Sequence, residues 1–319
     1  MRSGQSQLNV STPDAIQREG KEPLGPLSIG LAVLTVMLWG GTAVANSIAM
    51  DIYPPLFVGG VRFGLAAIFM VAWCWIEKTP LWLRGVQWWF ALIVGFLMFL
   101  QIATFSYGTA ISNSSHAIVL VNSYVFWVAF YEGIIRRSIH FQWWQVLGLF
   151  LAGGGIIVLV ANAEAEAVSK MDQPTLVGDL ILALSGFSLA VKALVVKEAV
   201  RRVPSSSLIL WHDVFGTGML LAFSFSVEQH SNQMPTVQVV GALLFGGIAI
   251  SGVCFVVNAM LLKKHCASQI AVFSFLSPLF GIVLAFVLRG DHLSRWLLLA
   301  GILVAAGIYL VNVASADDR

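Results

Sequence analysis

Two stretches of the chain, RRSIHFQWWQVLGLFLAGGG at residues 136–155 and RGDHLSRWLLLAGILVAAGI at residues 289–308, align without a gap at an offset of 153. The alignment extends over residues 115–158 and 268–311 and contains eight identities in 44 positions. In this alignment a loop arginine, an interfacial tryptophan and a Gly-x-x-x-Ala step occupy the same positions in both stretches. These shared positions are stronger evidence for a repeat than the number of identities. This internal similarity predicts that the chain contains one membrane unit twice.

The composition is typical of a membrane protein. Hydrophobic residues make up 58% of the chain and charged residues 11%, whereas a soluble domain carries about 25% charged residues. Apolar blocks recur that are long enough to cross a bilayer as helices, which takes ~20 residues. They predict ten transmembrane helices, at residues 27–49, 55–76, 88–109, 114–135, 142–163, 177–198, 205–226, 237–260, 267–288 and 296–314.

The predicted helices form two halves of five. Residues 1–26 are polar and predict a disordered cytoplasmic tail, and residues 27–163 form the first repeat. A linker at residues 164–176 leads to the second repeat at residues 177–314, and residues 315–319 form a second cytoplasmic tail. Because each repeat holds an odd number of helices, the halves must be inverted, an arrangement typical of transporters. We therefore expect an all-α membrane protein with two inverted five-helix repeats.

Further repeat signals lie outside the first alignment. Leu38-Trp39-Gly40 and Leu184-Ser185-Gly186 are equivalent at an offset of 146, and the second and seventh helices each follow a proline, Pro55 and Pro204. The offsets differ by a few residues, as changes in loop length would produce. The first and sixth helices should therefore take equivalent places in the two halves.

Positive charges are distributed unevenly between the loops. With a cytoplasmic N-terminus, thirteen Lys and Arg residues fall in cytoplasmic segments and three on the opposite side. This asymmetry predicts an inner-membrane protein with both termini in the cytoplasm. Of the Lys and Arg residues, only Arg62 and Lys192 fall well inside the predicted spans, since Lys197 lies at the cytoplasmic end of the sixth.

Polar residues recur within the spans at the spacing i, i+4, i+7, i+11, which is one face of a helix. Because polar side chains are costly in hydrocarbon, stripes on the first, third, fourth, sixth and eighth helices indicate a shared substrate cavity. The alternative is a purely structural role, in which Ser and Thr form hydrogen bonds within their own helix and Asn and Gln form hydrogen bonds between neighbouring helices. The candidate substrate-binding residues, with Ser277 added from the ninth helix, are Trp39, Thr42, Asn46, Gln101, Thr104, His116, Asn122, Ser123, Trp127, Ser188, Lys192, Ser251, Asn258 and Ser277.

Four residues are candidates for gating or coupling, and Lys192 has two interpretations. Arg62 could clamp a substrate charge, or it could lock the bundle through carbonyl contacts. His212 and Asp213 could relay protons because imidazole titrates near neutral pH, although adjacent helical residues diverge by ~100° and need not touch. Pro278 breaks the ninth helix, as at many transporter hinges. Lys192 could bind a carboxylate or a proton, or it could snorkel to the cytoplasmic surface.

Other patterns have simple structural interpretations. Glu132 and Arg136 are spaced i, i+4 and predict a surface ion pair. The steps Gly148-x-x-x-Ala152 and Gly301-x-x-x-Ala305 predict packing surfaces on the fifth and tenth helices, which carry no comparable polar stripe.

A set of motifs follows a fixed order along residues 28–313. They are Trp39-Gly40, Arg62 in a helix that begins after Pro, Ser277-Pro278 in the ninth helix, the loop Asp291-His292-Leu293-Ser294, and Gly301 with Ala306-Gly307. In order and spacing they resemble EamA-type proteins of the drug/metabolite transporter superfamily. The resemblance implies ten helices in two inverted repeats, a central substrate cavity, peripheral fifth and tenth helices, and export or exchange of metabolites such as amino acids.

The first half departs from the family pattern. Asn122-Ser123-Tyr124-Val125 stands where members often place Pro in the fourth helix, and Arg136-Arg137-Ser138 replaces an acidic residue after it. We therefore expect the two halves to move differently.

The leading hypothesis is a secondary transporter that exports or exchanges a small neutral or zwitterionic metabolite, such as an amino acid, by alternating access. No Gly-x-x-x-x-Gly-Lys-Ser/Thr motif for ATP hydrolysis is present, so the coupling partners would be protons or an exchanged solute. One alternative is an intramembrane enzyme, but the sequence contains none of the usual nucleophile or zinc motifs. The other is a passive pore, but the sequence contains no charge rings. The expected partners are a small-molecule substrate and the lipid bilayer. We expect no cofactor, metal or nucleic acid, and the three cysteines show no metal spacing.

Overall fold

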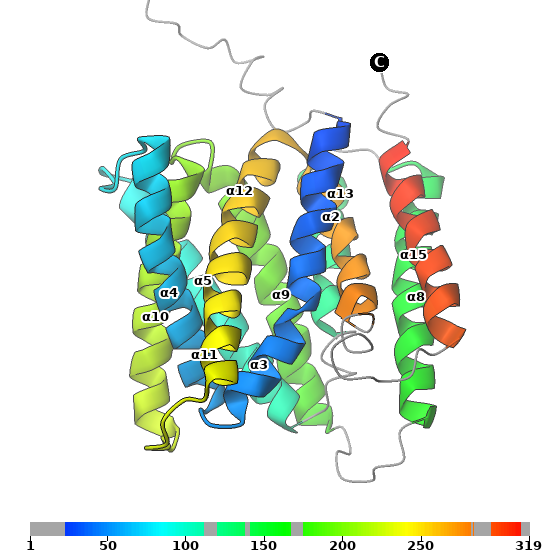
Figure 1. The fold of residues 1–319 in the computed structure, drawn as a ribbon. Coiled ribbons are helices and arrows are strands. Elements are labelled where there is room, and N and C mark those ends of the chain that lie inside the picture. Colours follow the sequence, from blue (N-terminus) through cyan, green and yellow to red (C-terminus); the bar gives the residue numbers. More distant parts are fainter. Residues whose placement is uncertain are drawn as a thin grey trace, which may run out of the picture.

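The computed structural model describes residues 23–111, 120–137, 141–166, 175–281, 283 and 295–313. Every regular element within these ranges is a helix, and the helices form a bundle (Figure 1). The elements are α2 (Pro26–Gly40), α3 (Thr42–Met50), α4 (Pro55–Glu77), α5 (Gln87–Ile111), α7 (Tyr124–Phe130), the π-helix η1 (Tyr131–Ile135), α8 (Trp143–Glu166), α9 (Leu176–Ala199), α10 (Ser205–Val227), α11 (Val237–Leu244), the π-helix η2 (Phe245–Cys254), α12 (Phe255–Lys264), α13 (Ala267–Ala271), the 3-10 helix η3 (Val272–Leu276) and α15 (Arg295–Val313).

Length and apolar composition make this an all-helical, multi-pass membrane protein. Among the described residues, five helices are long and apolar enough to cross a membrane, at Pro55–Glu77, Gln87–Thr109, Leu176–Ala199, Ser205–Val227 and the run Val237–Lys264. Shorter apolar helices lie at Pro26–Gly40, Leu120–Ile135, Trp143–Val158, Ala267–Gly281 and Leu299–Asn312. The order of these helices follows the predicted spans, while the count of ten membrane crossings stays a prediction.

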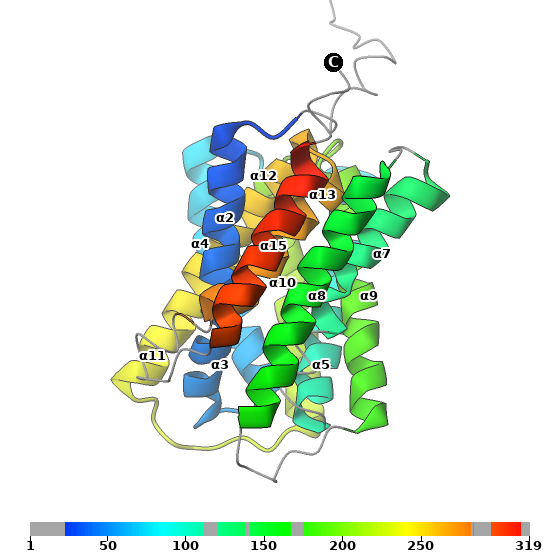
Figure 2. The same ribbon diagram turned by 90° about the vertical axis from the view of Figure 1, so that its right-hand side faces the viewer.

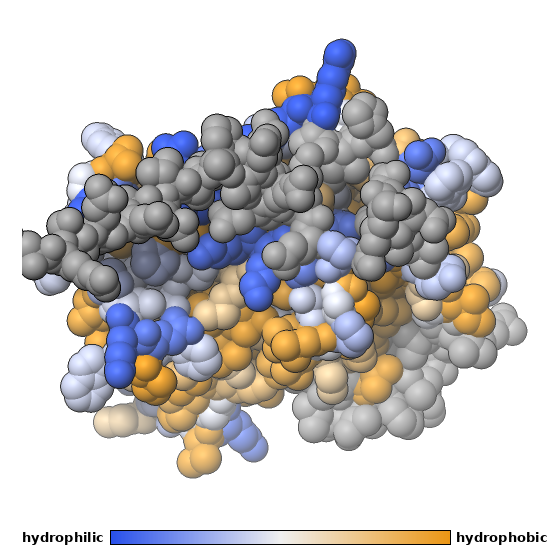
Figure 3. All heavy atoms as spheres, turned by 90° about the horizontal axis from the view of Figure 1, so that it is seen from above, coloured by the Kyte–Doolittle hydropathy of each residue, from blue (hydrophilic) through white to orange (hydrophobic). Residues whose placement is uncertain are grey.

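Basic side chains gather at one end of the bundle, which we call the basic end. Here α2 begins and α4, α9 and α12 end, at the top of Figure 1. Gln87 Nε2 donates to Arg202 O at 2.8 Å, and Ser28 Oγ lies 2.9 Å from His265 Nε2, so these chain segments meet. Figure 3 looks onto this end, where hydrophilic side chains lie among hydrophobic ones. The uneven charge of the loops thus corresponds to one face of the molecule.

Helices α4 and α10 hold each other's first turns. Glu228, directly after α10, accepts hydrogen bonds from Leu56 N at 2.9 Å and Phe57 N at 3.1 Å in the first turn of α4. In return, Ser206 in the first turn of α10 donates to the carboxylate of Glu77 at the end of α4. The first amides of a helix have no partner within the helix, so Glu228 caps α4, while Glu77 binds the first turn of α10 through a side-chain hydroxyl. This reciprocal contact is expected of inverted repeats.

Gly40 and Gly186, predicted to be equivalent, occupy equivalent helix crossings. A Cβ atom on Gly40 would lie 2.7 Å from Ser277 O, and one on Gly186 would lie 2.5 Å from Leu120 O. The first helix of each half therefore crosses the fourth helix of the other half. One prediction was wrong here: the first helix is not continuous but breaks at Gly41 into α2 and α3. Two successive glycines at a close crossing weaken the helix at this point.

Helices α8 and α15 pack against each other at one side of the bundle (Figures 1 and 2). The predicted surface on α8 is confirmed, because a Cβ atom on Gly307 would lie 2.4 Å from Gly148 O and 2.7 Å from Ala152 Cβ. The predicted surface on α15 was wrong, since Gly301 has open space around it and Ala305 is exposed. The contact lies on the adjacent face, rotated by ~100°. Its buried residues on α15 are Ala300, Val304, Gly307 and Val311.

Candidate functional site

Lys192 lies on the inner face of α9 and is 4% exposed. Its Nζ donates to Gln101 Oε1 of α5 at 3.3 Å and lies 4.9 Å from the centre of the Phe255 ring of α12. The side chain therefore ends inside the bundle and does not snorkel to the surface. Among the described residues no carboxylate lies within ion-pair distance of it. A buried ammonium held by neutral groups is costly, which indicates a place for an anionic group.

Phe255 is the centre of an aromatic cluster that joins both repeats. The centre of its ring lies 5.8 Å from that of Trp39, 5.7 Å from that of Phe63 and 5.5 Å from that of His212. Aromatic faces next to the ammonium of Lys192 provide an apolar surface beside a charge. Phe255 was not predicted, because one Phe in an apolar helix carries no sequence signal. The cluster can contact both a charged group and an apolar group.

His212 and Asp213 form a pair at the same level of the bundle. His212 Nδ1 lies 2.8 Å from Asp213 Oδ1, and both side chains are fully buried. The two residues therefore touch, although adjacent positions on a helix need not. In the part of the chain that the structure describes, His212 Nε2 and Asp213 Oδ2 have no hydrogen-bond partner. His212 and the ammonium of Lys192 lie against the same Phe255 ring, with the His212 ring centre at 5.5 Å and Lys192 Nζ at 4.9 Å from its centre. The site thus contains an ammonium and a carboxylate that each retain hydrogen-bonding capacity.

Arg62 joins α4 to its neighbours. Its Nη1 donates to Asn46 of α3, and its Nη2 lies 3.4 Å from both Gly246 O and Ser251 Oγ of η2. The widened π-helix η2 is a departure from α-geometry of the kind found at functional sites. These contacts match the interpretation in which Arg62 locks the bundle. They also occupy Asn46 and Ser251, two candidate substrate residues.

Two candidate hydroxyls bond back to their own helices. Thr104 Oγ1 donates to Leu100 O at 2.6 Å, and Ser123 Oγ donates to Leu120 O at 2.5 Å. Ser188, in contrast, is buried on the face of α9 that carries Lys192. Some predicted stripe residues therefore lie around Phe255 and Lys192, whereas others form hydrogen bonds within their own helix.

The remaining candidates are spread over the bundle. Trp127 is 44% exposed and packs edge-to-face against Phe187, with ring centres 5.4 Å apart, on the outside of the bundle. Pro278 is buried directly after the irregular helix η3, and the Ser277 carbonyl lies against Gly40. His116 lies outside the described residues. The partly buried candidates are Thr42, Asn122, Asn258 and Ser277.

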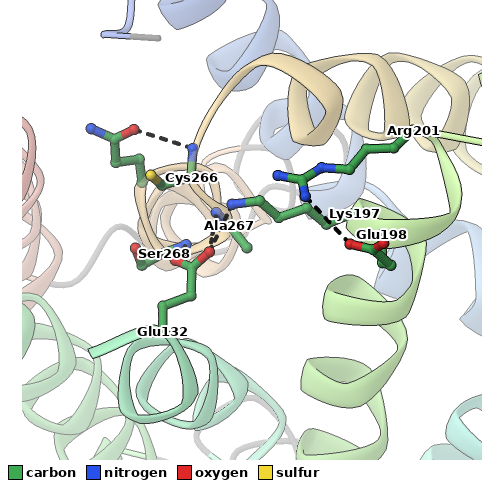
Figure 4. Close-up of polar contacts among 8 residues, drawn as sticks. Glu132, Lys197, Glu198, Arg201, Cys266, Ala267 and Ser268 are labelled. Carbon is green, nitrogen blue, oxygen red and sulfur yellow. Dashed lines mark hydrogen bonds and ion pairs between the residues drawn. The ribbon is translucent and has the colours of Figure 1, made fainter. Parts of the chain in front are cut away.

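A second charged cluster lies at the basic end (Figure 4). Glu132 is 3% exposed and accepts hydrogen bonds from Lys197 Nζ at 2.7 Å, Ala267 N at 3.1 Å, Ser268 N at 2.9 Å and Ser268 Oγ at 2.7 Å. The predicted surface pair between Glu132 and Arg136 was wrong. The chain is π-helical in η1, so the i, i+4 spacing of an α-helix does not apply. Glu132 is buried, whereas Arg136 is exposed.

Known proteins resemble this chain over most of its length. The model of the EamA-like transporter family matches residues 26–161 and 176–313. An uncharacterized transporter of Archaeoglobus fulgidus is 24% identical over 287 residues, covering 88% of this chain and 96% of the relative. A probable amino-acid metabolite efflux pump of Salmonella typhimurium is 26% identical over 291 residues, covering 88% and 93%. One solved crystal structure shares the fold, with a TM-score of 0.78 and 14% identity over 92% of this chain and 99% of that chain.

Proposed function

Because this chain belongs to the EamA-like transporter family, we propose that it is a secondary transporter of a small zwitterionic metabolite, with an amino acid as the leading candidate. It would export or exchange this substrate across the inner membrane by alternating access. The probable amino-acid metabolite efflux pump of Salmonella typhimurium supports the substrate class. We assign the basic end to the cytoplasm, following the charge asymmetry of the loops.

One observation carries the substrate class: Lys192 and the His212–Asp213 pair are buried around the same ring, that of Phe255, and neither Lys192 nor Asp213 is fully paired among the described residues. An amino acid offers a carboxylate to the ammonium of Lys192 and an ammonium to Oδ2 of Asp213. Its apolar part would contact the ring of Phe255. Such a substrate satisfies both buried charges and adds no net charge, so it offsets the cost of desolvating them.

His212 and Asp213 also provide a route for coupling to protons. The substrate ammonium and a proton would compete for the same oxygen of Asp213. The imidazole of His212 lies 2.8 Å from that carboxylate and has a second ring nitrogen, so it can pass the proton on. Proton entry would then drive substrate export, and an exchanged solute is the alternative driving partner.

The proposal is tested by counterflow into liposomes. The purified protein is reconstituted, the vesicles are loaded with unlabelled amino acids, and uptake of one labelled amino acid is followed with and without a pH gradient. We expect saturable uptake that falls at least about ten-fold in Lys192→Met and Asp213→Asn, because each loses one charge contact to the substrate.

The matched control is Lys263→Met, the same chemical change at an exposed lysine of the basic end. Lys263→Met should transport like the wild type. Uptake that does not saturate contradicts the carrier, and wild-type uptake in Lys192→Met contradicts the assigned site.

A further inference from the structure

The cluster around Glu132 joins three helices from both repeats (Figure 4). Glu132 lies in η1, at the end of the fourth helix of the first repeat. Lys197 comes from α9, while Ala267 and Ser268 form the first turn of α13, and both helices belong to the second repeat. We call these four residues the latch.

Both oxygens of the Glu132 carboxylate are used. Oε1 accepts from Lys197 Nζ and from Ala267 N, and Oε2 accepts from Ser268 N and Ser268 Oγ. A buried carboxylate is tolerated only with such complete pairing, and it also favours the positive end of a helix. The latch therefore holds its three helices strongly while it stays closed, and separating them leaves a buried charge without partners.

The neighbouring residue Glu198 shows what an ordinary pair looks like. It binds Arg201 at 3.4 Å and Arg202 at 3.3 Å, both in the same chain segment, and all three side chains are partly exposed. Figure 4 shows the pair of Glu198 and Arg201 beside the latch. Glu198 joins no second helix through these bonds, so it provides a matched control.

The sequence of the repeats carries no equivalent of Glu132 and Lys197 at the corresponding positions. At the offset of 153 Glu132 falls on Ala285, and at the offset of 146 Lys197 falls on Asp51. An alanine accepts no hydrogen bond through its side chain, so the inverted copy of this contact cannot form. The latch is therefore a charged contact that the first and second repeats do not share.

We infer that the latch closes the basic end of the transporter and must open each time the central site exchanges solute with the cytoplasm. The inference rests on the proposed function, because alternating access requires helices of the two repeats to separate at one end. Glu132 acts here as a positioning residue, which sets the balance between two states without touching substrate. The structure is the state in which the latch is closed.

Cys266 provides a native reporter of latch opening. It is the residue before α13, its thiol is buried, and it lies directly next to the two residues that Glu132 binds. A membrane-impermeant maleimide is added to inverted membrane vesicles, and peptide mass spectrometry measures the labelling rate of each cysteine. Labelling of a buried thiol follows the population of the open state, so the rate at Cys266 reports on the basic end.

Cys266 in Glu132→Gln is expected to be labelled about ten-fold faster than in the wild type. Opening the latch no longer leaves a carboxylate without partners, so the population of the open state rises. Ser268→Ala removes one hydrogen bond and should label about three-fold faster, and it serves if Glu132→Gln does not fold. Glu198→Gln should label at the wild-type rate.

Cys74 is buried near the end of α4, which also lies at the basic end but is not one of the three latch helices, so its labelling reports on general loosening of the bundle. Its labelling should stay unchanged in all variants. Unchanged labelling of Cys266 in Glu132→Gln and Ser268→Ala would overturn the inference. A parallel rise at Cys74 would also overturn it, because Glu132 would then support the packing of the bundle in general and not the contact between the latch helices.

The outcome is separable from that of the counterflow assay. Labelling requires no substrate, so a latch that opens faster in Glu132→Gln stands even if no amino acid is transported. Conversely, saturable counterflow with unchanged labelling would keep the transporter and remove the latch.

Discussion

Lys192 and Lys197 are two buried lysines on the same helix, and their partners differ in kind. Lys197 binds the carboxylate of Glu132 at 2.7 Å, within a cluster in which both carboxylate oxygens are used. Lys192 has an amide oxygen at 3.3 Å and an aromatic ring at 4.9 Å. A paired charge fastens helices together, whereas a charge held by neutral groups remains available to a ligand. Five residues of one helix thus separate a structural contact from a candidate binding site.

The largest contrast is expected in stability. Lys197→Met leaves Glu132 buried without its cation and should lower the free energy of unfolding by ~3–5 kcal/mol. Lys192→Met removes an ammonium with no carboxylate partner among the described residues and should change it by less than ~1 kcal/mol. Denaturant titration of both variants in mixed micelles measures the difference. Equal losses would mean that the two lysines do not differ in their role.

The second-largest effect is expected for the hydroxyl of Ser268, which donates a hydrogen bond to Glu132. Ser268→Ala removes a hydrogen bond to a charged group and should lower the free energy of unfolding by ~1.5–3 kcal/mol in the same titration. Ser274→Ala is the control, because Ser274 Oγ donates to Ala271 O at 2.7 Å within its own helix. A loss in Ser274→Ala as large as that in Ser268→Ala would contradict the assignment.

The comparison can also be reversed by giving Lys192 a carboxylate. Gln101→Glu should neutralise the ammonium and lower counterflow about ten-fold, which equals ~1.4 kcal/mol of substrate binding. Gln101→Leu removes the hydrogen bond without adding a charge and should retain most of the transport. If Gln101→Glu transports like the wild type, Lys192 does not bind the substrate carboxylate.

The smallest effect is expected at Thr104. Its hydroxyl already bonds to Leu100 O, so Thr104→Ala should change stability by no more than ~0.5 kcal/mol and leave counterflow unchanged. A clear loss of transport would place Thr104 in contact with the substrate after all.

Hydrophobic length was enough to predict where the five long helices lie. The second span, expected at residues 55–76, is found at Pro55–Glu77, because a membrane helix is specified by a long apolar block between polar ends. Gly40 and Gly186 were predicted to be equivalent from a short tripeptide match, and both lie at tight crossings. Such positions leave a sequence signal because only glycine lets two backbones approach so closely.

The partners of the charges could not be predicted in the same way. Glu132 and Lys197 are 65 positions apart in the chain, and spacing rules describe only contacts within one helix. The local pattern therefore favoured Arg136 as the partner of Glu132. Phe255 was missed for a related reason, since its role comes from four neighbours on four different helices. Spacing rules describe one helix at a time, so the pairs that form between helices were not predicted.

The reciprocal contact between α4 and α10 has a consequence for how the protein is made. The amides of Leu56 and Phe57 have Glu228 as their acceptor, which lies 172 and 171 positions later in the chain. During synthesis, the first repeat reaches the membrane before this acceptor exists. Its second helix therefore enters the bilayer with an uncapped first turn at the membrane surface. Assembly is complete only when α10 has been inserted, so a chain truncated after the first repeat should be held as an immature intermediate, open to quality-control proteases.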